Sequence, residues 1–297
     1  MTLNITVASP RFVICATDRR LTYSHTRKIV TEQSTKLTML RCIDALSLIA
    51  YNGIGKHQGK TPADWLQELD NRVGLTTLTL KCVLQAIREE AESRIATLPT
   101  NCDRRHSFVL GAWGRGRTWI CVISNYESAC SEVTFDKAQD RFEISALPEE
   151  AGREVRVLVT GSTQDAIRED LAKIGKVAKK AGAAGADIKN LCVKMIQHTA
   201  RKRNRRGTVG SSVLWAIAER FRGVEGGLDV PGGTAIQEMP RMIVPGMQCK
   251  DIRIEVPRGE PISWGKPFPL PEAQCSKCRN PVPLGYKVCG VCGTAIS

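Results

Sequence analysis

The feature that most restricts the fold is the grouping of strand-like and helix-like segments along the chain. Apolar and polar residues alternate at residues 3–7, the period of a half-buried strand, and strand-like segments follow at 12–17, 36–40 and 44–53. Two helical patterns come next, then more strands, two more helical patterns and an apolar segment at 211–219 that suits a strand or a short helix. Strands grouped apart from helices predict an α+β fold with antiparallel sheets and helices layered outside, which a four-layer αββα sandwich satisfies.

The first helical pattern has a clear starting signal. Thr61 is an N-cap residue, Pro62 occupies the first helical position, and Asp64 lies three residues after the cap. Apolar residues then recur at helical spacing from Trp65 to Val73, and again across residues 80–95, 167–178 and 188–199. These spacings predict two pairs of helices.

Composition divides the chain into three regions. Glycine and proline become dense from about residue 223 to 271, in runs such as VEGGLDVPGG and WGKPFPLPE. We therefore predict a main domain over residues 1–222, a Gly/Pro-rich region with one or two late strands and a linker over 223–272, and a small module over 273–297.

Charge and hydropathy exclude some functional classes. The chain has 43 Lys and Arg against 30 Asp and Glu, a net charge of +13 that attracts acidic partners and polyanions. We expect no membrane span, because no stretch approaches the roughly 18 apolar residues that one requires. The start does not resemble a secretory signal, so a cytoplasmic location is expected. Eight of the 12 cysteines are scattered, as buried apolar residues in a reducing compartment would be.

The N-terminus carries a possible nucleophile. Thr2 is small enough to favour removal of Met1, which would leave a free threonine directly on the first strand. Its α-amino group would titrate at roughly 7.7 to 8.0 and so accept the proton of its own hydroxyl near neutral pH. A lysine held by an aspartate would supply the positive charge that such a hydroxyl needs.

Asp18 in ATDRRLT lies sixteen positions after Thr2, and STKLTML supplies Lys36 at the expected third long strand. This order of residues resembles that of the proteasome-type β-subunits of the N-terminal-nucleophile (Ntn) hydrolases. The resemblance covers roughly residues 2–217 and implies the four-layer fold, a threonine peptidase or amidohydrolase acting on a peptide or protein, and assembly into a homo-oligomer, with a ring possible. It also implies that Gly53 donates its N–H to the oxyanion and that Ser162 in VTGSTQDAI supports the site.

One region departs from the family pattern. Where the family has an aspartate shortly before Ser-Gly, this chain reads RKRNRRGTVGSS, and the corresponding Arg205, Arg206, Thr208 and Gly210 are not acidic. Either another group orients the threonine or the site is degenerate. Simpler interpretations also exist for individual residues, since an Asp-Lys pair can be a plain structural ion pair and Gly-Ser before a helix is often a turn and an N-cap.

The basic run at residues 201–206 has two interpretations. Such runs usually form a solvated helix end, where cations complement the helix dipole, and they can also bind acidic peptides or nucleic acid. The run lacks interleaved aromatic residues, which argues against nucleic acid. His25, His57, His106 and His198 show neither metal-ligand nor triad spacing.

The strongest local motif lies at the C-terminus. Two CxxC pairs, Cys275 with Cys278 and Cys289 with Cys292, are separated by ten residues that suit a short hairpin. Four thiolates match the tetrahedral preference of Zn²⁺, and four cysteines leave no open position for catalysis. The pattern predicts a structural zinc ribbon, folded mainly by its metal, that recruits a protein partner or substrate.

The sequence thus favours an N-terminal threonine hydrolase with a C-terminal zinc ribbon. The alternative is a catalytically inactive, proteasome-like scaffold or adaptor that acts through the ribbon, because a fold does not imply its activity.

Overall fold

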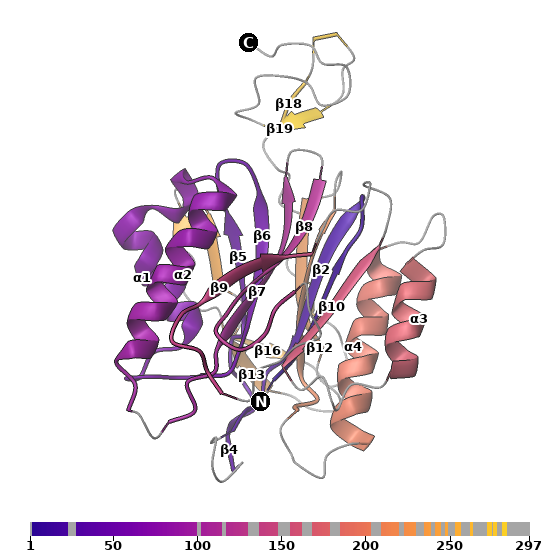
Figure 1. Cartoon of the computed structure of the whole chain (residues 1–297). Coiled ribbons are helices and arrows are strands. Elements are labelled where there is room, and N and C mark those ends of the chain that lie inside the picture. Colours follow the sequence, from indigo (N-terminus) through magenta and orange to yellow (C-terminus); the bar gives the residue numbers. More distant parts are fainter. Residues whose placement is uncertain are drawn as a thin grey trace.

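The chain folds into two sheets enclosed by two pairs of helices (Figure 1). The computed structural model describes residues 2–22, 28–99, 102–114, 117–129, 137–147, 155–161, 168–178, 185–202, 209–219, 223–229, 235–238, 241–244, 247–248, 253–256, 262–263, 272–274, 276–277 and 281–283. No helix within these ranges is both long and apolar enough to cross a membrane.

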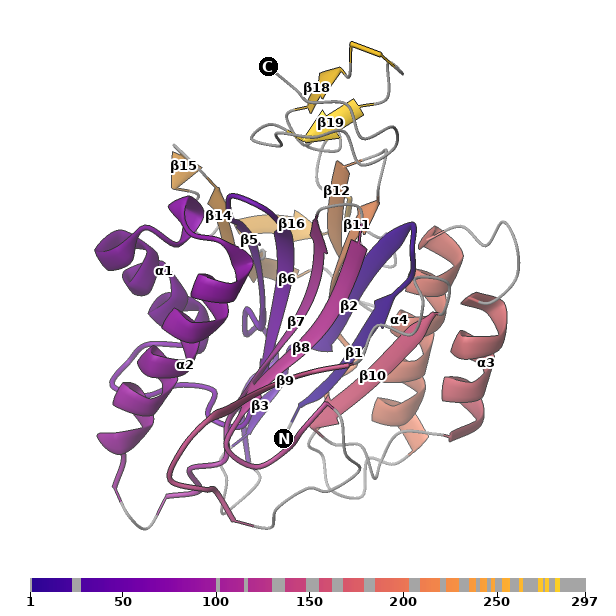
Figure 2. The same ribbon diagram turned by 45° about the horizontal axis from the view of Figure 1, so that its top comes forward.

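The first sheet has six strands, all paired antiparallel. Helices α3 (Arg168–Ala178) and α4 (Gly185–Lys202) cover its outer face (Figure 2). In spatial order the strands are β10 (Arg156–Gly161), β1 (Leu3–Ala8), β2 (Phe12–Asp18), β11 (Val213–Glu219), β12 (Gly223–Asp229) and β17 (Ile262–Ser263). The predicted hairpin of the first two strands is confirmed, and residues 213–219 form a strand rather than a helix.

The second sheet has seven strands and is antiparallel except for one pair. In order they are β15 (Met247–Gln248), β14 (Arg241–Val244), β5 (Leu37–Arg41), β6 (Leu46–Asn52), β7 (Ser107–Gly114), β8 (Arg117–Ser124) and β9 (Glu143–Ala146). The parallel pair is β14 with β5. Helices α1 (Pro62–Val73) and α2 (Leu80–Ala96), joined through a short 3-10 helix at Leu75–Thr77, cover the outer face.

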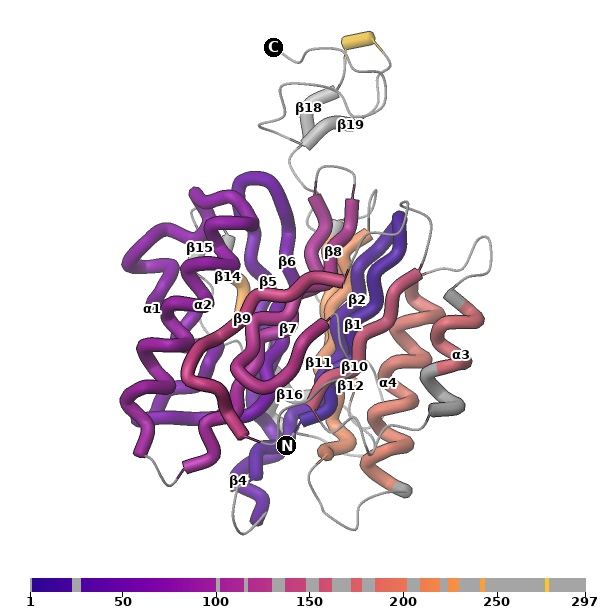
Figure 3. The backbone as a smooth tube through the Cα atoms, in the orientation of Figure 1, coloured from indigo at the N-terminus to yellow at the C-terminus, as the bar shows by residue number. Residues whose placement is uncertain are grey.

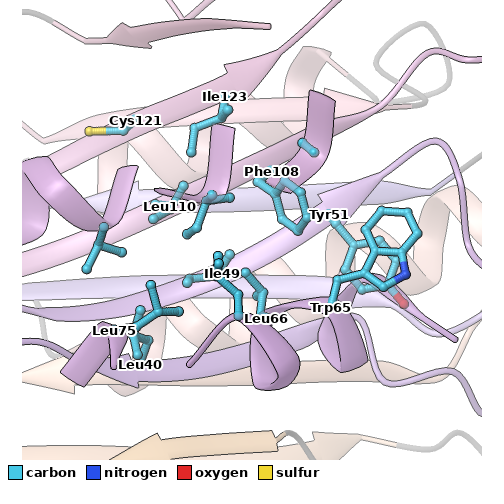
Figure 4. Close-up of a cluster of buried hydrophobic side chains, with 14 of the residues drawn as sticks. Leu40, Ile49, Tyr51, Trp65, Leu66, Leu75, Phe108, Leu110, Cys121 and Ile123 are labelled. Atoms are coloured by element: carbon cyan, nitrogen blue, oxygen red, sulfur yellow. The ribbon is translucent and has the colours of Figure 1, made fainter. Parts of the chain in front are cut away.

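Strand periodicity explains the layers. Ile14 on β2 packs toward α4, whereas its neighbours Val13 and Cys15 face the second sheet. On β6, Ile49 and Tyr51 pack under α1 and α2 and belong to the cluster shown in Figure 4. The alternate residues Leu48 and Ala50 face the first sheet. Because successive side chains of a strand point to opposite faces, each sheet supports one helix layer and shares one core with the other sheet. The predicted layering is therefore observed.

Local signals in the sequence account for the start and end of α1. Thr61 and Asp64 form the reciprocal capping box that the sequence predicts, and Pro62 is the first helical residue. Gly74 ends the helix in the left-handed conformation, with φ of 66°. The helix axis is thus fixed at both ends by short-range chemistry.

Part of the late, Gly/Pro-rich region belongs to the main sheets. Strand β12 pairs with β11 along its whole length, β14 lies beside β5, and β13 (Ala235–Glu238) pairs with β16 (Arg253–Val256). The described part of this region therefore holds more strands than the one or two expected. Further along, β18 (Glu272–Gln274) pairs with β19 (Pro281–Pro283), on either side of the first CxxC pair in the sequence. Residues 284–297 lie outside the described part of the chain.

The N-terminus lies at one end of the two-sheet core (Figure 3). A small hairpin of β3 (Leu21–Thr22) and β4 (Ile29–Thr31) follows β2 at the same end. In the first sheet, pairing brings the ends of β2 and β10 beside the start of β1. In the second sheet, the start of β5 pairs with the end of β6, and the residue before β5 contacts Thr2. This convergence builds the candidate site.

Candidate active site

The hydroxyl of Thr2 lies in direct contact with a buried lysine. Thr2 immediately precedes β1 and only 5% of its surface is exposed. Lys36, immediately before β5 on the opposite sheet, donates a hydrogen bond from Nζ to Thr2 Oγ1 over 2.6 Å. The two sheets thus bring together residues that lie 34 positions apart in the sequence.

Lys36 is held in place by two further oxygens. Its side chain is fully buried, and Nζ lies 3.4 Å from Asp18 Oδ2 and donates to the carbonyl oxygen of Arg20. Burial lowers the pKa of Lys36 below its ordinary value, because an ammonium group loses hydration, while the Asp18 carboxylate opposes that shift. The result is a fixed, dry cation aimed at the threonine hydroxyl.

Asp18 connects three separate segments around Thr2. Its Oδ1 accepts the N–H of Leu3 over 2.7 Å, and its Oδ2 accepts the N–H groups of Arg20 and Gly210 over 3.0 and 3.1 Å. The Lys36 ammonium shares Oδ2. The side chain is completely buried, so these donors provide the compensation that a buried carboxylate requires.

The region that departs from the family pattern therefore reaches the site through its backbone. Gly210 belongs to the RRGTVG segment, and its backbone N–H donates a hydrogen bond to Asp18. The segment therefore contacts the site without an acidic side chain. Arg205, Arg206 and Thr208 lie outside the described residues.

The predicted Gly53, and Gly161 just before the predicted Ser162, both occupy positions that need glycine. Gly53 follows β6 with φ of 89°, and Gly161 ends β10 with φ of 84°. A side chain at Gly53 would overlap the carbonyl oxygen of Arg105, and one at Gly161 would overlap the carbonyl oxygen of Thr2. Left-handed backbone and close approach together exclude other residues. Gly161 also pairs with Leu3, which places it against the threonine.

Two of the predicted groups cannot be located. Ser162 follows Gly161 but lies outside the described residues, as do Cys275, Cys278, Cys289 and Cys292. Among the residues that the structure does describe, there is no group of three or more His, Cys, Asp or Glu side chains able to hold a metal ion.

A polar cluster beside Thr2 was not anticipated from the sequence. Asn4, on β1, donates from Nδ2 to Asn52 Oδ1 over 2.5 Å, which joins the threonine strand to the strand that leads to Gly53. The Nδ2 of Asn52 in turn donates over 3.1 Å to both Ser107 Oγ and Glu127 Oε1. No motif or spacing in the sequence marks these four residues. A polar side chain in an apolar segment needs a hydrogen-bond partner, but the sequence does not show which residue provides it.

Comparisons with known proteins support the fold. No protein-family model matches the chain, and no curated protein sequence is found as a relative. Among solved structures, Anbu (ancestral beta-subunit) from Yersinia bercovieri matches with a TM-score of 0.50 and 11% identity, over 73% of this chain and 81% of that one. An Anbu (Gly-1) mutant from Hyphomicrobium sp. strain MC1 gives 0.48 and 12%, over 74% and 83%. A helical assembly of the Anbu complex from Pseudomonas aeruginosa gives 0.47 and 15%, over 73% and 81%.

At these identities the likeness concerns the fold alone. The chain has a mixed α/β fold that resembles Anbu, a proteasome-like Ntn-hydrolase subunit. The resemblance to the wider family is thereby supported at the level of architecture.

Proposed function

We propose that this chain is an N-terminal threonine hydrolase that cleaves peptide or protein substrates. The observation that carries the proposal is the contact of Lys36 Nζ with Thr2 Oγ1, backed by buried Asp18. A fully buried lysine aimed at a hydroxyl is costly to a fold, and perturbed buried groups concentrate at functional sites. The Anbu-like fold is consistent with this chemistry.

The proposed reaction begins with removal of Met1, which frees the α-amino group of Thr2. The amine accepts the hydroxyl proton while Oγ1 attacks the substrate carbonyl, and the Lys36 ammonium stabilises the developing alkoxide. The tetrahedral intermediate expels the leaving amine, which takes the proton from the Thr2 amine. Water then hydrolyses the ester, with the same amine as base, and restores the threonine.

The neighbouring residues receive supporting roles in this proposal. Asp18 fixes Lys36 and the backbone of Leu3, so the ammonium and the threonine strand keep one geometry. Gly53 would offer its N–H to the oxyanion, and Ser162 would assist proton transfer near the amine. The Gly210 N–H bound to Asp18 offers one physical way to orient the site without an acid in the RRGTVG segment.

We extend the proposal to assembly and to the C-terminal module. The resemblance of Thr2, Asp18 and Lys36 to proteasome-type β-subunits leads us to include a homo-oligomer, a ring being one form. The donor set of Cys275, Cys278, Cys289 and Cys292 fits one structural Zn²⁺, because four thiolates satisfy its tetrahedral shell. The bound metal would order this ribbon as a docking module for a protein partner or substrate.

Intact mass spectrometry with a threonine-directed peptide epoxyketone tests the proposal. We expect a chain without Met1 that gains one adduct, and no adduct in Thr2→Ala. Thr2→Ser is the matched variant, since it keeps a hydroxyl and should still react. A processed chain that never reacts would favour the inactive scaffold, the alternative that the missing acid at residues 205–210 raises.

A further inference from the structure

A partly buried glutamate near Thr2 has no role in the reaction described above. Glu127 follows β8, and its Oε1 accepts hydrogen bonds from Asn52 Nδ2 over 3.1 Å and Ser107 Oγ over 2.5 Å. The backbone N–H of Gly161 and the hydroxyl of Tyr126 lie nearby and favour the charged form of the carboxyl. The two hydrogen bonds to Oε1, from side chains on β6 and β7, hold the carboxylate in place.

Asn52, one of these two donors, lies between two segments beside the threonine. It is the residue before Gly53, and it ends β6. Gly161 ends β10, lies against the Thr2 carbonyl and close to Asn52 Oδ1, and precedes Ser162. The carboxylate of Glu127 therefore holds the side chain that lies between the backbone leading to the candidate oxyanion donor and the backbone leading to the candidate supporting serine.

The same contacts reach the threonine strand. The Oδ1 of Asn52 accepts from Asn4, two residues after Thr2, and lies close to Gly161. Because its Nδ2 is bound to Glu127 and Ser107, the Asn52 amide has one orientation that satisfies every partner. Asn4 and Asn52 are both fully or almost fully buried, so water does not compete for these bonds.

We propose that Glu127 is a positioning residue of the threonine site, which aligns Gly53 and the end of β10 with Thr2 through its bond to Asn52. The inference rests on the proposed hydrolase function. Glu127 acts in its ionised form, as the acceptor of the bonds from Asn52 and Ser107. Burial raises the pKa of this carboxyl above its ordinary value, while the surrounding donors oppose that rise.

Glu127→Gln is the direct test because it keeps the shape and removes the charge. The neutral amide is a weaker acceptor than the carboxylate, so it holds the Asn52 and Ser107 donors less firmly. We expect the maximal rate of epoxyketone modification to fall about tenfold to a hundredfold. The inhibitor concentration that gives half of this rate should stay within about twofold, because the substrate-binding surface is unchanged. Glu143→Gln, which removes an exposed carboxylate on β9, is the matched control and should react like the wild type.

A second readout does not depend on activity. Hydrogen–deuterium exchange of the peptides that contain Gly53 and Gly161 should become faster in Glu127→Gln and stay unchanged in Glu143→Gln. Should Glu127→Gln fail to fold, Asn52→Ser provides the same test, since it breaks the bond to Glu127 and leaves the carboxylate in place.

The outcomes separate the two claims. A wild-type chain that reacts, with Glu127→Gln reacting equally fast, overturns the positioning role and leaves the hydrolase standing. A rate loss matched by an equal loss in affinity for the inhibitor also overturns it. A processed wild-type chain that never reacts overturns the hydrolase and this inference together.

Discussion

Lys36 Nζ and Thr2 Oγ1 lie 2.6 Å apart across the space between two sheets. The two residues lie far apart in the sequence, and both are buried. The contact exists because β1 and β5 belong to facing sheets whose ends coincide. In the proposed reaction, this contact lets the lysine stabilise negative charge on the threonine oxygen.

Replacing Lys36 by methionine should abolish most of the reactivity of Thr2. Methionine fills a similar volume but carries no charge, so the alkoxide loses its stabilising cation. We expect the rate of epoxyketone modification to fall by about 10²-fold or more, with Met1 still removed. The measurement is intact mass over time. Lys60→Met, at a largely exposed lysine on the surface, is the control and should react normally. Equal rates in both variants would contradict the role of Lys36.

Replacing Asp18 by asparagine should destabilise the whole fold as well as the site. The buried carboxylate accepts bonds from Leu3, Arg20, Gly210 and Lys36, and asparagine would leave the lysine without its counter-charge. We expect the free energy of unfolding in urea to fall by about 3–5 kcal/mol. Asp140→Asn, at an exposed aspartate, should stay within about 0.5 kcal/mol.

A double variant separates the charge pair from the other bonds. Asp18→Asn combined with Lys36→Met removes both charges together, so it should cost less than the sum of the two single variants. If the losses in unfolding free energy of the two single variants simply add, Asp18 and Lys36 are not energetically coupled. That result would contradict the role of Asp18 as the counter-charge of Lys36.

The proposed zinc ribbon makes a prediction independent of the threonine site. Native mass spectrometry of the whole chain should detect one Zn²⁺, because four cysteine thiolates would complete one tetrahedral shell. Cys289→Ser should lose the metal, and Cys82→Ser, which changes an exposed cysteine of α2, should keep it. A metal-free wild type prepared with zinc present would exclude the ribbon.

Local patterns predicted the parts of the fold that depend on local physics. The capping box at Thr61 and the strand alternation around Ile5 act over a few residues, so the sequence shows them directly. The spacing of Thr2, Asp18 and Lys36 indicated the site only through resemblance to a family. That the three side chains meet is a consequence of facing sheets, which periodicity alone does not specify.

Other features depended on long-range pairing and could not be predicted. Strand β14 inserts parallel to β5 after about 200 intervening residues, and nothing in its short apolar run identifies that partner. The bond of Asn52 to Glu127 joins residues 75 positions apart. Such pairs have no spacing rule, because they depend on the order in which the strands of the second sheet pair.

Stability should fall at acidic pH because of His106. Its ring is completely buried among Trp65, Tyr51, Phe108 and Phe142, and both ring nitrogens are without hydrogen-bond partners in the described structure. Burial lowers the pKa of His106 to about 3, from 6.5. Between these values the unfolded chain binds the proton and the folded chain does not, so stability rises with pH across this window.

The slope of this effect is measurable. It reaches about 1.4 kcal/mol per pH unit, the value for one proton. His106→Phe should remove this contribution from the free energy of unfolding measured in urea between pH 4 and 6.5, because phenylalanine has no proton to bind. His57→Gln is the control, since that ring is less buried and contacts Thr97. An unchanged slope in His106→Phe would mean that other groups dominate acid unfolding.

Alanine at Gly161 and at Gly59 should have very different effects, although both glycines have a positive φ, 84° and 80°. At Gly59 nothing lies near the added Cβ, so only the backbone strain remains, about 1 kcal/mol. At Gly161 the Cβ would overlap the Thr2 carbonyl oxygen, which adds a steric cost and brings the total to about 3 kcal/mol or more.

The overlap at Gly161 also has a functional consequence. The backbone of Thr2 must move to relieve it, and a shift of about 1 Å at a reacting group costs about a hundredfold in rate. We therefore expect Gly161→Ala to react slowly with the epoxyketone under conditions in which it remains folded, and Gly59→Ala to react like the wild type. Equal reactivity in the two variants would show that Thr2 tolerates displacement, and the precise fit between β10 and the threonine would then have no part in the reaction.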